Sequence, residues 1–270
     1  MKKTLVSKTV LALACLSAMG AAQAQSSAPA EPESTLAFNA GVVSEYRYRG
    51  ISQSRFLPAV QGGVDYADKS GFYVGAWATT IQWIKDNGAV SLSPSGNGAS
   101  GPVELDLYGG YKFNLGDVAM DVGYLRYECV NNTLAKNTSY KNANTDEVYA
   151  AGTYGPFTLK YSYALSSLFG QIGTGSKSTK GSDYIDLSAT FDLGNGFTLV
   201  PHVGKQTVKN LDIATYTDYA LTLNKDLGDG WSASAAVIDT NAQLGNYAAP
   251  TQSTKNLGKS TVVLGVKYTF

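Results

Sequence analysis

Three charged residues alternate with two tyrosines in the segment Glu45-Tyr46-Arg47-Tyr48-Arg49. Alternate side chains of an extended strand point to the same face, so Glu45, Arg47 and Arg49 would form one charged cluster. Two adjacent guanidinium groups can order anionic groups through paired hydrogen bonds. The alternative is a structural role, in which the arginines pair with Glu45 and with Asp65 or other acids and hold the chain in place.

The sequence offers few groups for acid–base or nucleophilic catalysis. His202 is the only histidine. Strand-based membrane lipases and deacylases pair such a histidine with a serine two residues later on the same face, where this chain has Gly204. We therefore interpret His202 as a hydrogen-bonding residue and not as a general base.

The carboxylate pairs and the cysteine do not indicate acid–base catalysis or a metal site. Glu104/Asp106 and Asp186/Asp192 have the spacing of an acid and a base, but solvated charges on a strand look the same in sequence. Cys129, expected to be an inert free thiol, and one distant histidine do not make a transition-metal site. We expect no enzyme activity, no metal and no cofactor.

The elements that position these residues are strands, because apolar residues recur with a period of two. In 103–115, Leu105, Leu107 and Phe113 share one face, while Glu104, Asp106 and Lys112 share the other. No segment after the N-terminal one reaches 18 consecutive apolar residues, which excludes a membrane-spanning helix there. The expected strands are twelve: 36–49, 58–67, 72–84, 103–115, 117–128, 145–154, 157–166, 182–193, 197–206, 216–227, 231–240 and 260–270.

Connections of alternating length follow these strands. Short turns such as 193–197 and 227–231 alternate with longer segments, and each of these two ends on an aromatic residue that suits a membrane interface. The pattern predicts an all-β fold, a closed antiparallel transmembrane β-barrel of about twelve strands, with short periplasmic turns and longer extracellular loops. The alternative is a soluble β-sandwich or a lipocalin-like barrel, which would also alternate.

In a closed barrel, the polar parity faces a water-filled lumen. Tyr46 and Tyr48 take the other parity and would lie at the level of the lipid headgroups. The candidate lumen-lining residues are Glu45, Arg47, Arg49, Asp65, Glu104, Asp106, Lys112, Lys160, Asp186, His202 and Lys267.

The N-terminus has a basic start, an apolar run and the small-residue site Ala22-Gln23-Ala24. This pattern predicts a signal peptide over 1–24, and a lipoprotein signal around Cys15 is the alternative. The polar, proline-containing stretch 25–35 is expected to be a flexible periplasmic tail, followed by the barrel over 36–270. The formal net charge of zero gives no basis for nucleic-acid binding.

Several motifs resemble the TorF-type porin family of proteobacteria. They are SEYRYRGISQ (44–53), PAVQGGVDY (58–66), SGFYVG (70–75), ELDLYGGY (104–111) and DEVY (146–149). The resemblance extends over nearly the whole chain after 24. It implies an outer-membrane barrel that passes small solutes, and it supplies no substrate. The terminal residue Phe270 also resembles the signal that such barrels present to the barrel-assembly machinery.

The predicted function is therefore passive diffusion of small hydrophilic solutes through the outer membrane. The competing class is a narrow, plugged barrel with an envelope structural or surface-interaction role, and a lipid-modifying enzyme is the third option. The longer connections contain ten basic residues against Asp86 and Asp212, so they could bind lipopolysaccharide phosphates. The expected wall has more acids than bases and predicts a preference for cations. Its acids are Glu45, Asp65, Glu104, Asp106, Asp121, Glu147, Asp186 and Asp192.

Overall fold

The computed structural model describes residues 33–90, 99–136, 139–249 and 252–270. The predicted signal peptide 1–24 and most of the predicted tail 25–35 lie outside the described residues. The tail prediction was two residues too long, because Ser34 and Thr35 already pair with Asp68 and Ala67 in the first strand.

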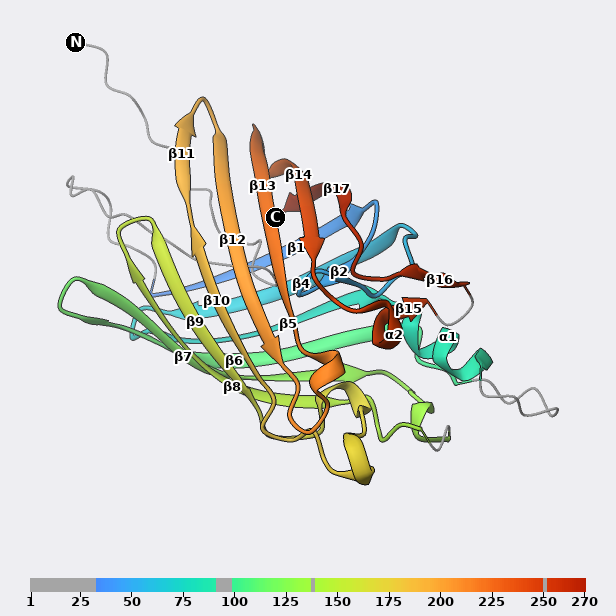
Figure 1. Ribbon diagram of the computed structural model, residues 1–270. Helices are drawn as coiled ribbons and strands as arrows, with labels where there is room; N and C mark the ends of the chain where they lie inside the picture. The colour runs from blue at the N-terminus through green and yellow to red at the C-terminus, as the bar shows by residue number, and fades with distance from the viewer. Residues whose placement is uncertain (1–32, 91–98, 137–138, 250–251) are drawn as a thin grey trace, which may run out of the picture.

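Thirteen of the described strands form one closed antiparallel ring (Figure 1), and the remaining four form two small two-stranded sheets, β2–β3 and β15–β16. Closure has two seams: the first strand pairs with the last, and β10 pairs with β12. β10 and β11 are two parts of one barrel strand that is interrupted at Thr190. The thirteen strands of the sheet therefore correspond to a twelve-stranded barrel. The strands are β1 (Ser34–Val43), β4 (Ala59–Asp68), β5 (Phe72–Thr80), β6 (Val103–Leu115), β7 (Val118–Cys129), β8 (Thr145–Tyr154), β9 (Phe157–Ala164), β10 (Asp183–Ala189), β11 (Phe191–Gly194), β12 (Phe197–Thr207), β13 (Tyr216–Gly228), β14 (Trp231–Thr240) and β17 (Thr261–Thr269).

The outer face of the ring is apolar, as the period of two predicts. Large exposed hydrophobic residues on this face include Leu36, Val60, Val74, Leu107, Val122, Val148, Leu159, Leu187, Leu221, Val237 and Leu264. A water-soluble protein rarely exposes an apolar surface of this extent. A band that runs around the ring matches the lipid-facing surface of a transmembrane β-barrel. None of the described helices is long and apolar enough to cross a membrane.

The two ends of the barrel differ. At one end, called the turn end, the strands are joined by tight turns, and outward-facing aromatics such as Phe197 and Trp231 are exposed. Gly230 of one turn has φ +83°, and a Cβ there would lie 2.3 Å from the carbonyl oxygen of Thr269, so only glycine fits.

The other end, called the loop end, holds the short elements, which Figure 1 shows gathered at one side of the ring. They are β2 (Arg47–Tyr48), β3 (Ile51–Ser52), α1 (Trp83–Val90), η1 (Leu134–Lys136), η2 (Leu168–Gly170), η3 (Thr174–Ser176), η4 (Asp212–Ala214), α2 (Leu244–Tyr247), β15 (Ala248–Ala249) and β16 (Gln252–Asn256).

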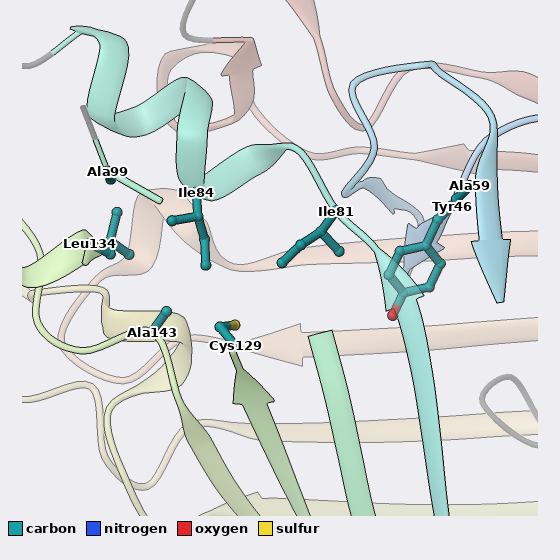
Figure 2. Close-up of a cluster of buried hydrophobic side chains, with 8 residues drawn as sticks. All are labelled: Tyr46, Ala59, Ile81, Ile84, Ala99, Cys129, Leu134 and Ala143. Carbon is teal, nitrogen blue, oxygen red and sulfur yellow. The ribbon is translucent and has the colours of Figure 1, made fainter. Parts of the chain in front are cut away.

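The loop end contains buried apolar clusters of its own. In one cluster, Ile84 of α1 and Leu134 of η1 pack with Cys129 at the end of β7 (Figure 2). Cys129 is a buried free thiol. A second cluster includes Ile51, Val208 and Tyr247. The described loops are therefore packed structures.

Three predicted strands differ from the structure by more than two residues at one end or by a break. The expected strand 36–49 ends at Val43, the expected strand 72–84 ends at Thr80, and the strand 182–193 breaks at Thr190. The first error has the largest consequence, because the neighbour β4 begins at Ala59, opposite Val43, so the pairing of β1 with β4 ends there. Ser44 still donates its amide to the Leu264 carbonyl oxygen of β17 at 2.8 Å. The chain leaves the ring there.

Candidate functional site: the barrel interior

Segment 44–58 leaves the ring after β1 and its charged residues become buried at the loop end. Arg47 binds Glu45 through Nε at 3.0 Å and donates from Nη1 to the carbonyl oxygens of Gly50 and Lys259 at 2.8 and 2.9 Å. Tyr46 donates its hydroxyl to Glu104 of β6 at 2.6 Å. The predicted position of Tyr46 and Tyr48 at the lipid headgroups was therefore wrong, since Tyr46 is 5% exposed and Tyr48 packs on Tyr127 and Phe169.

Arg49 connects this segment to two walls of the barrel. Its Nη2 lies 2.7 Å from Glu147 Oε2 on β8, and its Nη1 donates to Gln206 Oε1 on β12 at 2.6 Å. The guanidinium also lies over the rings of Tyr48 and Tyr184, at 4.6 and 4.2 Å from their centroids. Burial is the largest single influence and lowers the pKa of Arg49, but Glu147 together with Tyr48 and Tyr127 outweighs it, so the pKa is raised above its usual value. Arg49 therefore remains charged.

The backbone at Arg49 is in a conformation that costs energy. Its φ is +46°, in the left-handed region that non-glycine residues seldom adopt. Such a residue persists only where its surroundings hold it, and here two charge-assisted hydrogen bonds and two aromatic rings do so. The contacts of Arg49 hold segment 44–58 against the walls.

His202 lies between two aspartates on neighbouring strands. Its Nε2 is 2.6 Å from Asp186 Oδ2, and its Nδ1 is 3.6 Å from Asp218 Oδ1. The Tyr184 hydroxyl lies 3.0 Å from Nε2 and donates to both Asp218 oxygens at 3.1 Å. Both ring nitrogens thus face carboxylates. A Cβ at position 204 would lie 1.9 Å from the Tyr184 hydroxyl, so a serine nucleophile has no room there.

These side chains form what we call the mouth cluster, at the loop end of the interior. Its members are Glu45, Arg47, Arg49, Glu104, Asp106, Glu147, Asp186, His202, Gln206 and Asp218. Glu104, Asp106 and Asp218 are 1% exposed, and Arg49 is 6% exposed. Six carboxylates thus face two arginines and one histidine in a closely packed layer. Its charge is predominantly negative.

A second group, the turn-end network, lines the interior nearer the turns. Tyr108 donates to Asp65 at 2.5 Å, and Tyr73 donates to Asp121 at 2.7 Å and contacts the Tyr149 hydroxyl. Two ammonium groups lie over aromatic rings, Lys112 over Tyr73 at 4.9 Å and Lys160 over Tyr149 at 3.9 Å. The members are Asp65, Tyr73, Tyr108, Lys112, Asp121, Tyr149, Lys160 and Lys267, and all are partly exposed.

The eleven predicted site residues thus fall into two groups, which the sequence pattern did not separate. Asp65, Lys112, Lys160 and Lys267 belong to the turn-end network, and the other seven belong to the mouth cluster. Asp186 and Asp192, which have acid–base spacing in sequence, lie in different surroundings, because Asp192 is exposed at a turn and accepts from the Gly194 amide at 2.8 Å, whereas Asp186 contacts His202. Arg49 pairs with Glu147 and not with Asp65.

Several interior residues are missing from the candidate site residues, among them Tyr184, Gln206 and Asp218. Parity alone would have found Asp218, since it shares a face with Ala220 and Thr222 on a predicted strand. Among the described residues, no group of three His, Cys, Asp or Glu side chains has a geometry that could hold a metal ion.

The fold and the charged interior define a transmembrane β-barrel of twelve strands. The chain belongs to a family described as "Bacterial protein of unknown function (Gcw_chp)", whose model matches residues 26–270. No curated protein matches it in sequence.

The solved structures similar to this chain include two porins and an outer-membrane protein. The NanC porin has a TM-score of 0.51 at 11% identity, covering 87% of this chain and 99% of its own. The KdgM porin has 0.49 at 9% identity, covering 88% and 99%. Omp33 of Acinetobacter baumannii has 0.45 at 6% identity, covering 87% and 97%. At these identities the likeness to NanC shows the fold alone.

Proposed function

We propose that the protein is an outer-membrane porin through which small hydrophilic solutes diffuse passively. One observation carries the proposal: the inner face of a closed twelve-strand ring holds ionisable groups of both signs that are partly exposed, such as Asp65, Lys112 and Lys160. A partly exposed charge on an inner face requires water, because burying it without water is costly. The interior at the turn end is therefore hydrated.

The proposed location and orientation follow from the same barrel. The short turns face the periplasm and the packed loops face outward, as is usual for bacterial barrels. A signal peptide over 1–24 delivers the chain across the inner membrane. Phe270 pairs with Phe38 at the seam and would be read there by the barrel-assembly machinery. The motifs at 44–53 and 58–66 support assignment to the TorF-type porins as part of this proposal.

The mouth cluster sets the size and charge of the solutes in this proposal. Segment 44–58 occupies the loop end, so the path is narrow and is set by Arg49 and its partners Glu147 and Gln206. The predominantly acidic cluster favours cations over anions. The two nitrogens of His202 are engaged by Asp186 and Asp218, so the proposal assigns it no catalytic step.

A second candidate is a plugged barrel with an envelope structural or surface-interaction role. The near-complete burial of Glu104, Asp106 and Asp218 favours it, because a closely packed layer blocks solute passage unless segment 44–58 moves. The two candidates differ in whether the native barrel conducts.

Liposome swelling tests the proposal with the protein as it exists. Vesicles that hold the purified barrel are diluted into isotonic solutions of sugars of increasing size, and swelling is followed by light scattering. We expect swelling with the smallest sugars and none with oligosaccharides, while protein-free vesicles stay constant. Folded, inserted protein that admits none of the sugars would overturn the porin proposal and favour the plugged barrel.

A further inference from the structure

Three lysines gather on the outside of the barrel at the loop end of β10 and β12. Lys205 is exposed on the lipid-facing parity of β12, between the buried Gly204 and Gln206. Its register partner on β10 is Ile185, which pairs in turn with Tyr161 of β9, and both partners are exposed. Lys205 therefore occupies the same outward row as an apolar and an aromatic side chain.

The other two lysines lie on the two loops directly beyond this row. Lys180 is exposed next to Gly181, in the connection from β9 to β10. A Cβ built at Gly181 would lie 3.3 Å from Lys209 Nζ and 2.9 Å from the Tyr163 hydroxyl. Lys209 and the Tyr163 hydroxyl thus lie against Gly181, and the exposed Lys180 is its neighbour in the chain. Tyr163 has the same outward parity on β9 as Tyr161, so this group lies on the same side of the barrel as Lys205.

The backbone that carries these lysines is well held. The Lys209 amide donates to Ser182 Oγ at 3.0 Å, and Asn210 Nδ2 donates to the Ser178 carbonyl at 2.8 Å. The Thr174 amide donates to the Asn210 carbonyl at 2.7 Å. The two loops are therefore joined, and Figure 1 shows them side by side, in yellow and orange.

The charge of this patch is not neutralised within the described protein. None of Lys180, Lys205 and Lys209 forms an ion pair with a described residue. The carboxylate on the neighbouring strand β10 is that of the half-buried Asp183, which is paired with Thr207 in the register. Around the ring on β7 and β8, the outward-facing Arg126 is instead bound to Glu128 at 2.7 Å and Asp146 at 2.9 Å. The lysine patch is thus distinct from its surroundings.

We propose that Lys180, Lys205 and Lys209 bind the phosphate groups of an outer-leaflet lipid. Exposed Tyr161 lies in the same outward row as Lys205, and exposed Tyr219 lies in the adjoining row. Aromatic residues mark the depth of lipid headgroups. A lysine at that depth extends its ammonium to the phosphate layer while its stem covers apolar surface. This inference rests on the outer-membrane location of the proposed function.

Native mass spectrometry of the folded barrel in neutral detergent tests the site. The probe is lipid A with two phosphates, and the variant is Lys205→Gln/Lys209→Gln. Since a lysine near an anionic surface contributes about 1 kcal/mol, we expect the double variant to bind the probe at least about tenfold more weakly. Lys136→Gln/Lys141→Gln, which removes two exposed lysines from another loop, should bind as the wild type does.

Additional controls distinguish a lipid phosphate from free phosphate, and loss of the lysine charges from misfolding. Lys205→Arg/Lys209→Arg should restore binding, which excludes misfolding as the cause of the loss. The proposal is overturned if dephosphorylated lipid A binds equally well, if inorganic phosphate displaces the probe at equal concentration, or if both glutamine variants lose binding alike. A barrel that binds lipid A as described but never conducts would overturn only the porin proposal.

Discussion

The mouth cluster and the turn-end network line the same barrel, yet they solve the problem of interior charge in opposite ways. In the mouth cluster, water is excluded and the arginines are held by carboxylates and aromatic rings, as Arg49 is by Glu147 and Tyr184. In the turn-end network, Lys112 and Lys160 remain partly exposed beside tyrosines. Buried pairs are costly to break, whereas solvated charges are tolerant of change. In the porin proposal, control of passage is therefore assigned to the mouth cluster.

The largest effect is expected from Arg49→Ala. The change leaves Glu147 buried without its cation and removes a hydrogen bond to Gln206, so we expect a loss of about 3–5 kcal/mol of stability, as for other broken buried pairs. Chemical unfolding in detergent measures it. The double variant Arg49→Ala/Glu147→Ala removes both charges and should recover part of the loss. An unchanged unfolding midpoint in the single variant would refute the importance of this pair.

A smaller effect is expected on selectivity from Glu104→Gln/Asp106→Asn. Both side chains are 1% exposed in the acidic layer, so neutralising them should shift the reversal potential across a salt gradient away from cation preference. Asp192→Asn is the matched control, since Asp192 is exposed at a turn. A wild-type barrel that prefers anions would show that Arg47, Arg49 and the loop lysines control entry instead.

The smallest effect is expected from Lys160→Gln in the turn-end network. The ammonium lies 3.9 Å from the Tyr149 ring centroid at a partly exposed site, so its loss should cost about 0.5–1 kcal/mol. The unfolding midpoint and the ion selectivity should both stay near those of the wild type. A destabilisation as large as that of Arg49→Ala would remove the difference between the two regions.

The sequence predicted the ring but not the departure of segment 44–58 from it, for a physical reason. The alternation of apolar and polar residues is a local pattern within each strand. It therefore predicted the barrel strands and the outward direction of residues such as Leu107 and Leu264. Glu45 to Arg49 also alternate, and alternation cannot report that the neighbouring strand begins only at Ala59, so that this segment leaves the ring. Their burial depends on partners far away in sequence, such as Glu104 and Gln206. No local pattern encodes those contacts.

The same limit explains the errors within the site. His202 was placed on a polar face by parity, but the pairing of its nitrogens with Asp186 and Asp218 depends on the order of strands around the ring. Asp186 and Asp192 looked equivalent in sequence, although the break at Thr190 places Asp192 at an exposed turn. The order of the strands around the ring and the positions of strand interruptions must be known before ion pairs can be predicted.

Single-channel conductance in planar bilayers tests the central claim most directly. The wild-type barrel should give small, stable conductance steps, because segment 44–58 narrows the loop end. Arg49→Ala, which releases that segment from Glu147 and Gln206, should give larger or more frequent steps, while Lys160→Gln should conduct as the wild type does. Larger steps in Lys160→Gln together with unchanged steps in Arg49→Ala would contradict control by the mouth cluster.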